Sequence, residues 1–189
     1  MGVRFVVRSK ATTYICGDIP WSIDPKELHP NSSLIFPMNH EVLLLSKHFN
    51  QFSIALMNHP EWFQAEQPWS KAYVVNEMIN PLVKWLIDQE IITEKDMNMD
   101  NEFMIVTPSV IYQVLRDFGV IEITDYASFV LEEQVLYPYF VHIEHDKNID
   151  QQVKNMIFAI MKRHTHLDSQ FYQYIYPQGK YIFFKEEDL

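Results

Sequence analysis

Two histidine-rich stretches late in the chain carry the residue types that bind metals and transfer protons. HIEHD contains His142 and His145, and HTHLD contains His164, His166 and Asp168. If such groups converged on one ion, a divalent metal could lower the pKa of a bound water, as in a metal-assisted hydrolase. The simpler interpretation places these histidines at the surface or at helix ends. A divalent metal is therefore the alternative to a protein without a cofactor.

The stretch TYICGDIPW contains the only cysteine of the chain, Cys16, followed by Gly17 and Asp18. A cysteine nucleophile needs a nearby base or helix N-terminus to lower the pKa of its thiol, and the sequence around Cys16 offers neither. We interpret Cys16 as a small buried side chain. Asp18 can fix the turn after a strand by accepting hydrogen bonds from backbone N–H groups. A ligand or metal role for Asp18 is the alternative.

Three tryptophans lie in proline-rich connections rather than on helical stripes: Trp21, Trp62 and Trp69. Tryptophan is enriched at the energetic centres of protein interfaces, so these side chains are candidates for a partner-binding surface. They could also cover the core. Trp85 differs from them because it lies within a predicted amphipathic helix.

Acidic residues crowd the stretch from Asp88 to Glu102. The simplest interpretation is a solvated face that aids solubility. The alternative is a patch that meets a basic partner, for which we select Glu90, Glu94 and Asp96 as candidates.

Composition excludes several classes of protein. The net charge of −10 at pH 7 argues against general nucleic-acid binding, because Lys and Arg contacts to phosphates supply most non-specific affinity. No apolar run approaches the roughly 20 residues that span a bilayer, and no signal peptide is evident. We therefore expect a soluble cytoplasmic protein without a membrane partner. A single cysteine excludes an internal disulfide, and the four scattered glycines exclude phosphate-binding loops.

The elements that must position these residues alternate between strands and helices. Strands are predicted in VRFVVR, TYIC, SLIF, VLLL, FSIALM, VIEIT, residues 138–144 and YIYPQGKYIFF, where a Pro-Gln-Gly turn joins two strands. Helices are predicted over residues 70–90, 107–119 and 125–136, and from residue 149 onward. We predict an α+β fold, with a mixed or mainly antiparallel sheet and several helices packed on it. A single domain over residues 1–189 would combine a β-rich part, about 1–60, with a helix/strand part, about 69–189.

Three of the helices have notable signals. Over residues 70–90 the apolar spacing is helical, but Asn80-Pro81 either kinks the helix or begins a second one. Over residues 107–119 we expect Thr107 to cap the helix and Pro108 to open it. From residue 149, the helix would bury the apolar side chains Val153, Met156, Ile157 and Ile160.

YICGDIPW and the later SLIFPMNHEVLLL together resemble an uncharacterised bacterial domain family. Asp18, Pro20, Phe36 and Pro37 match its strand-end Asp-x-Pro turn and its following Phe-Pro strand, over about residues 5–47. The helical segment that normally precedes this block is absent here, and the family has no settled activity to carry over. The resemblance implies a bacterial or phage origin and draws attention to Asp18.

Two functions follow as hypotheses. The first is a non-enzymatic protein-binding module, such as an immunity or inhibitor protein, that acts through an acidic, aromatic-bearing surface. The acidic balance, the aromatic content and the absence of local catalytic signatures favour it. The second is a small metal-assisted hydrolase that uses Asp18 with histidines of the two late stretches. Oligomeric state does not follow from the sequence.

Overall fold

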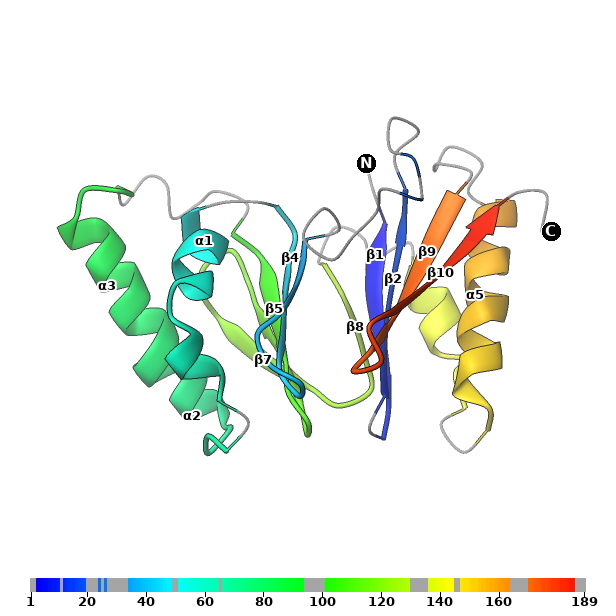
Figure 1. Ribbon diagram of the computed structural model, residues 1–189, viewed down its shortest axis with the longest axis horizontal. Coiled ribbons are helices and arrows are strands. Elements are labelled where there is room, and N and C mark those ends of the chain that lie inside the picture. The colour runs from blue at the N-terminus through cyan, green and yellow to red at the C-terminus, as the bar shows by residue number, and fades with distance from the viewer. Residues whose placement is uncertain are drawn as a thin grey trace. The chain divides into compact units, whose positions relative to one another are not determined.

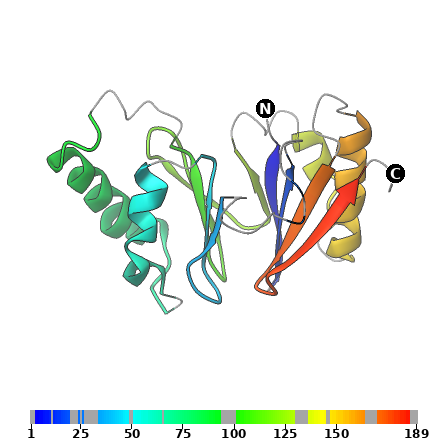
Figure 2. The same cartoon turned by 45° about the horizontal axis from the view of Figure 1, so that its top comes forward.

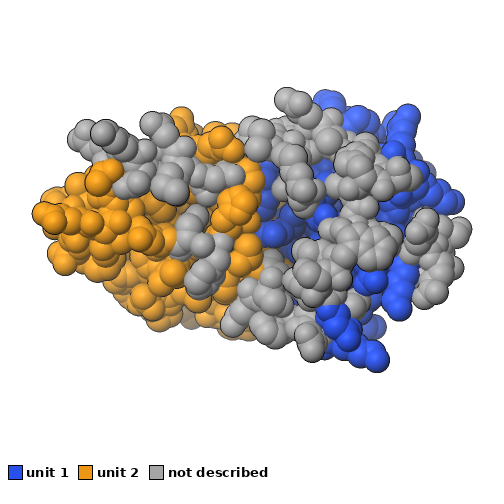
Figure 3. Space-filling view, turned by 90° about the horizontal axis from the view of Figure 1, so that it is seen from above, with its two compact units in different colours: residues 1–28, 125–189 blue, residues 29–124 orange. Residues whose placement is uncertain are grey.

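The computed structural model describes residues 3–10, 12–19, 24, 26, 34–48, 51–64, 66–93, 101–129, 136–144, 147–163 and 170–185. The chain divides into two compact units, which Figure 3 colours separately. Unit 1 comprises Met1–Leu28 and Asp125–Leu189, and unit 2 comprises His29–Thr124. Unit 2 is thus inserted within the sequence of unit 1, and each unit has a five-stranded sheet. The α+β class predicted from the sequence is confirmed.

The sheet of unit 1 has the strand order β10-β9-β2-β1-β8, and its neighbours pair antiparallel. Its strands are β1 Arg4–Ser9, β2 Thr12–Asp18, β8 Tyr126–Ser128, β9 Gln170–Tyr176 and β10 Lys180–Lys185. The predicted turn between the last two strands is confirmed, with Gly179 at φ 67°. Helix α5, Ile149–Arg163, covers one face of this sheet (Figures 1 and 2). Its four predicted apolar residues are buried, as expected: Val153, Met156, Ile157 and Ile160.

The sheet of unit 2 has the order β3-β4-β5-β6-β7, an antiparallel meander. Its strands are β3 Ile35–Pro37, β4 Leu43–Ser46, β5 Phe103–Val106, β6 Ile111–Val114 and β7 Val120–Ile123. Its helical segments are α1 Gln51–Met57, η3 Pro60–Phe63, α2 Lys71–Tyr73, η4 Val74–Ile79 and α3 Asn80–Asp88. The α-helices lie along one side of the sheet (Figure 2), where their buried faces share a core with Leu44, Phe103 and Tyr112.

Residues 71–88 form one continuous helical run, so Asn80-Pro81 does not start a separate helix. Ser70 caps the run, because its Oγ accepts a hydrogen bond from the N–H of Tyr73 at 3.1 Å. The segment η4 is a π-helix, in which the N–H of Asn80 donates to the carbonyl of Val75. Proline cannot donate a backbone hydrogen bond and crowds the carbonyl four residues earlier. The wider π turn directly before Pro81 relieves that conflict.

The helix predicted over residues 107–119 is wrong. Thr107 and Pro108 lie in the turn between β5 and β6, where the Thr107 hydroxyl donates to the carbonyl of Val110 at 2.8 Å. Proline is well suited to such a turn because its φ is fixed. Ile111–Val114 form strand β6, and all four residues are buried, the polar Gln113 included. A strand buried on both faces is a continuous apolar run, which also satisfies helical spacing.

Three other element predictions are also wrong. FSIALM forms helix α1 rather than a strand, and its buried residues Phe52, Ala55 and Leu56 recur at helical spacing. Residues 136–140 are helical rather than extended, with Leu136 and Phe140 buried four positions apart. The helix expected after Asp125 is replaced at its start by β8, which pairs with β1.

The single domain predicted from the sequence stays a prediction, and the compact units divide the chain after residues 28 and 124 rather than near residue 60. None of the helices in the described residues is long and apolar enough to cross a membrane.

Candidate protein-binding surface on helix α3

Asp18 lies at the end of β2 and fastens the beginning of the described chain. Its Oδ1 accepts a hydrogen bond from the N–H of Val3 at 2.6 Å. Its own N–H donates to the carbonyl of Val3 at 3.1 Å. These contacts match the structural role considered for Asp18. The ligand role stays a prediction.

Cys16 is fully buried in the sheet of unit 1, where it pairs with Phe5 on one side and with Gln173 on the other. Burial raises the pKa of the Cys16 thiol well above its ordinary value, and the charge of Asp150 raises it further. The thiol is therefore protonated near neutral pH, unlike an activated nucleophile.

Of the proposed metal ligands, only His142 belongs to the described residues, and it lies exposed in the turn after the helical residues 136–140. His145, His164, His166 and Asp168 lie outside those residues. No three or more His, Cys, Asp or Glu side chains of the described part are grouped so that they could hold a metal ion. The metal site stays a prediction.

The tryptophans occupy different environments. Trp69 is half-buried, packs against the core of unit 2, and lies 6.2 Å from Tyr112 between ring centroids. Its indole Nε1 is buried and has no hydrogen-bond partner among the residues that the structure describes. Trp62, on η3, is also half-buried against this core. Trp21 lies outside the described residues, as do Glu94 and Asp96.

An aromatic cluster, which we define as His59, Trp62 and Trp85, lies on the helical side of unit 2. The His59 ring stacks on Trp62 with centroids 4.3 Å apart and 15° between planes. The His59 ring also lies edge-on to the Trp85 ring, with centroids 6.5 Å apart. Trp85 on α3 remains 46% exposed, unusual for so large an apolar side chain.

One carboxylate contacts the aromatic cluster, and a second is exposed after α3. Glu61 accepts a hydrogen bond from Nδ1 of His59 at 2.8 Å, which assigns that nitrogen as the donor. This hydrogen bond is the main reason that the pKa of Glu61 falls below its usual value. Glu90, a candidate from the acidic stretch of the sequence, is exposed two residues beyond α3 and has a backbone φ of 55°.

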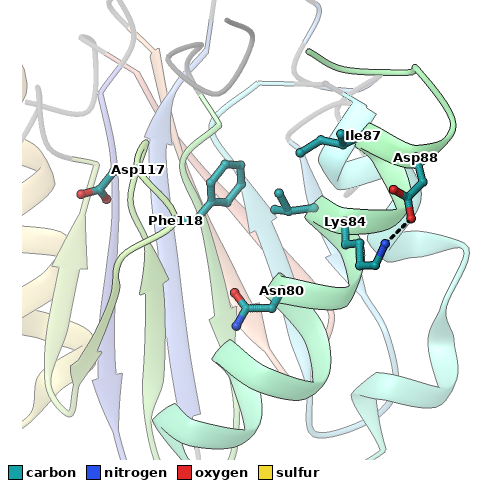
Figure 4. Close-up of a pocket in the computed structure, with 7 residues that line it drawn as sticks. Asn80, Lys84, Ile87, Asp88, Asp117 and Phe118 are labelled. Atoms are coloured by element: carbon teal, nitrogen blue, oxygen red, sulfur yellow. Dashed lines mark hydrogen bonds and ion pairs between the residues drawn. The ribbon is translucent and has the colours of Figure 1, made fainter. Parts of the chain in front are cut away.

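A pocket lies on another flank of α3, with a volume of about 450 Å³. Its walls are one face of α3 and the turn between β6 and β7 (Figure 4). Seven residues line it: Asn80, Val83, Lys84, Ile87, Asp88, Asp117 and Phe118. The Phe118 ring points towards α3, whereas the ion pair of Lys84 with Asp88, 2.6 Å between Nζ and Oδ2, lies on the outer side of the helix.

A buried ion pair in unit 2 was not anticipated from the sequence. Glu102 has a side chain only 1% exposed, and its Oε2 lies 3.1 Å from Nζ of Lys47, which is 8% exposed. Its Oε1 lies 3.3 Å from Nε of Arg116, which is 46% exposed. Lys47 follows β4 and Glu102 precedes β5, so the pairing of these strands brings the two charges together.

Comparisons with known proteins bear on the fold. No protein family and no curated protein matches the chain. Among solved structures, Anbu (ancestral beta-subunit) from Yersinia bercovieri matches with a TM-score of 0.60 and 11% identity, over 98% of this chain and 88% of that one. BPH of Thiobacillus denitrificans matches with a TM-score of 0.59 and 13% identity, over 93% of this chain and 97% of that one. The chain shares the fold of these proteins. BPH in complex with epoxomicin also matches, with a TM-score of 0.58 and 13% identity over the same shares of the two chains.

The described residues thus differ in what they offer to a ligand or partner. The cysteine is buried and protonated, and Asp18 holds backbone. By contrast, α3 presents an exposed tryptophan, a pocket and acidic side chains. The sequence placed Trp85 on a helix but gave no sign of its environment, because the His59 ring that meets it edge-on comes from a different segment.

Proposed function

We propose that the chain is a non-enzymatic protein-binding module that binds a partner through the aromatic cluster on α3. The observation that carries the proposal is the 46% exposure of Trp85 beside the stacked pair of His59 and Trp62. Rigid aromatic groups that are partly supported by the core suit the energetic centre of an interface, because little conformational entropy is lost when they are covered.

The exposed carboxylates of unit 2 favour a basic partner. Glu61 and Glu90 are exposed on the same unit, and the whole chain carries a net charge of −10. Complementary charges steer encounter and disfavour acidic competitors. An immunity or inhibitor protein that neutralises a basic target would have these properties. The name of the neighbour Anbu describes it as a beta-subunit, and a protein contact is also what a subunit requires.

Site-specific photo-crosslinking tests the proposal. A benzophenone amino acid replaces Gln89, which is exposed one turn beyond Trp85, and the cells that naturally express the chain are irradiated. We expect one discrete adduct. It should be absent when the same group replaces Gln151, an exposed glutamine on α5. Truncation of an interface hot spot costs about 2 kcal/mol or more, roughly 30-fold in affinity, so Trp85→Ala should nearly abolish the adduct.

Charge reversal tests the character of the partner. Glu90→Lys should weaken the adduct and make it less sensitive to salt, because a rim charge acts mainly on the association rate. If no adduct forms at position 89, or if it survives Trp85→Ala unchanged, the aromatic cluster is not a binding surface. If only the charge reversal is without effect, the basic character of the partner is wrong.

A further inference from the structure

The pocket beside α3 has an apolar centre and a charged rim. Val83 and Ile87 contribute apolar surface from the helix. The ring of Phe118, in the turn between β6 and β7, points towards that helix (Figure 4). Asn80 lines it as a polar group that can pair with a backbone amide. Its volume of about 450 Å³ falls within the roughly 300–1,000 Å³ of ligand pockets, and it is open to solvent.

Phe118, which forms this wall, has an unfavourable backbone conformation. Its φ is 62°, in the left-handed region that bulky side chains rarely adopt. Hydrogen bonds on both sides fix the turn, from Leu115 N–H to the carbonyl of Gly119 at 2.8 Å and from Phe118 N–H to the carbonyl of Leu115 at 3.0 Å. Glycine or asparagine would suit the position better. Strain of about 1–3 kcal/mol at such a residue points to a role for its side chain.

The ring of Phe118 also packs on Phe52 of α1, with centroids 4.9 Å apart, so it is supported from behind. It is nevertheless only half-buried. The ring is therefore fixed in place by the core while part of it still faces the pocket. Such a preorganised apolar surface loses little entropy when it is covered.

The rim of the pocket carries more acid than base. Asp88 and Asp117 line it against Lys84 alone. Lys84 is already paired with Asp88 at 2.6 Å. The Oδ1 of Asp117 accepts the N–H of Gly119 at 2.9 Å and so holds the turn. The rim thus keeps one net negative charge, which complements a cation.

We infer that this pocket binds a short segment of a protein partner in which an aliphatic side chain is flanked by lysine or arginine. The aliphatic group packs between Phe118 and α3, and the basic groups lie along the acidic rim. Because Lys84 competes for Asp88, the inference also assigns Lys84 an attenuating role. This inference rests on the proposed function, since it gives the partner's chemistry at a second place on α3.

Titration of the ¹⁵N-labelled full chain with three peptides tests the inference by NMR. The probes are acetyl-Ala-Lys-Leu-Lys-Ala-amide and two matched controls, in which alanine replaces the leucine or glutamates replace both lysines. We expect millimolar or tighter binding of the first peptide, with shifts of the Val83, Phe118 and Gly119 amides. Each control peptide should bind at least about fivefold more weakly, the loss of roughly 1 kcal/mol that one small apolar or charged contact supplies.

Variants of the pocket make the test specific. Lys84→Gln should tighten binding of the lysine peptide severalfold, because Asp88 then becomes available to the ligand. Asp117→Asn should weaken it, while its amide oxygen can still accept the N–H of Gly119 and preserve the turn. Phe118→Ala should abolish the amide shifts. If the Phe118→Ala chain does not fold, Lys84→Gln and Asp117→Asn still test the inference.

Equal binding of all three peptides, or no shift at these amides, would overturn the inference. Weaker binding by the Lys84→Gln chain would contradict the role given to Lys84. The outcome is separate from that of the proposed function, which is measured by the adduct at position 89. An adduct that forms without any peptide binding leaves the aromatic cluster in place and removes only the pocket.

Discussion

The buried charge of Glu102 provides a sharp test of how unit 2 is held together. Glu102→Gln keeps the shape of the side chain but removes its charge. The ammonium of Lys47, 3.1 Å away and 8% exposed, then loses this counter-charge within the protein. At that separation the attraction is about 5 kcal/mol with an effective dielectric constant of about 20. Desolvation of both groups offsets part of it, and breaking a buried pair costs about 3–5 kcal/mol in practice.

We therefore expect Glu102→Gln to lower the free energy of unfolding by about 3–5 kcal/mol. The double variant Lys47→Met/Glu102→Met should lose far less, within about 1 kcal/mol of the natural chain, because no charge then remains to be desolvated at the pair. Arg116→Gln serves as the matched control. Its guanidinium is 46% exposed, and exposed pairs contribute only about 0–1 kcal/mol.

Urea denaturation at pH 7 measures these differences, followed by tryptophan fluorescence and by far-ultraviolet circular dichroism. Three of the four tryptophans, all but Trp21, belong to unit 2, so fluorescence mainly reports the unfolding of that unit. Where the two probes do not coincide, the fluorescence transition is the one to compare. A loss below about 1 kcal/mol for Glu102→Gln, or a double variant as unstable as the single one, would refute the reasoning about the buried pair.

Two further predictions concern unit 1. A methyl group at Gly17 would lie 2.8 Å from Oη and 2.9 Å from Cε1 of Tyr172. Gly17→Ala should therefore lower the free energy of unfolding in urea by about 1–3 kcal/mol, and Gly17→Ala/Tyr172→Leu should recover part of the loss. An unchanged urea midpoint in Gly17→Ala would contradict the close packing. Because the pKa of Cys16 is raised by burial and by Asp150, the unfolded thiol loses its proton near its ordinary value of 9.0 while the folded thiol keeps it. The contribution of the Cys16 thiol to the free energy of unfolding should therefore be fully present below pH 9 and be lost as the pH rises beyond it. The fall in the free energy of unfolding between pH 8 and pH 10 should be smaller in Cys16→Ala.

The sequence was informative where one face of an element is polar. Helix α5 was predicted correctly because solvent leaves a clear period on such an element. The hairpin of β9 and β10 was predicted from its Pro-Gln-Gly turn instead, since β9 is buried along almost its whole length. It failed at Ile111–Val114, where all four residues are buried. No polar face then marks the period of two, and the neighbouring Thr107 and Pro108 suit a turn as well as a helix start.

The candidate surface was only partly predictable, for a different reason. Composition predicts an acidic, aromatic-bearing surface, but which tryptophan faces outward depends on packing between segments. Trp69 is partly covered by the core, whereas Trp85 is flanked by a histidine 26 positions earlier in the chain. The pair of Lys47 with Glu102 likewise joins residues 55 positions apart, a separation that local patterns do not encode.

The π turn of η4 also corrects the phase of the helix. Val74, Met78, Leu82 and Leu86 recur every four residues, and all are buried. In an uninterrupted α-helix each such step drifts by about 40°, so the first and last of them would point about 120° apart. One extra residue in a turn removes about 100° of that drift. The extra residue of the π turn therefore keeps an apolar period of four residues on one face of a helix that has 3.6 residues per turn.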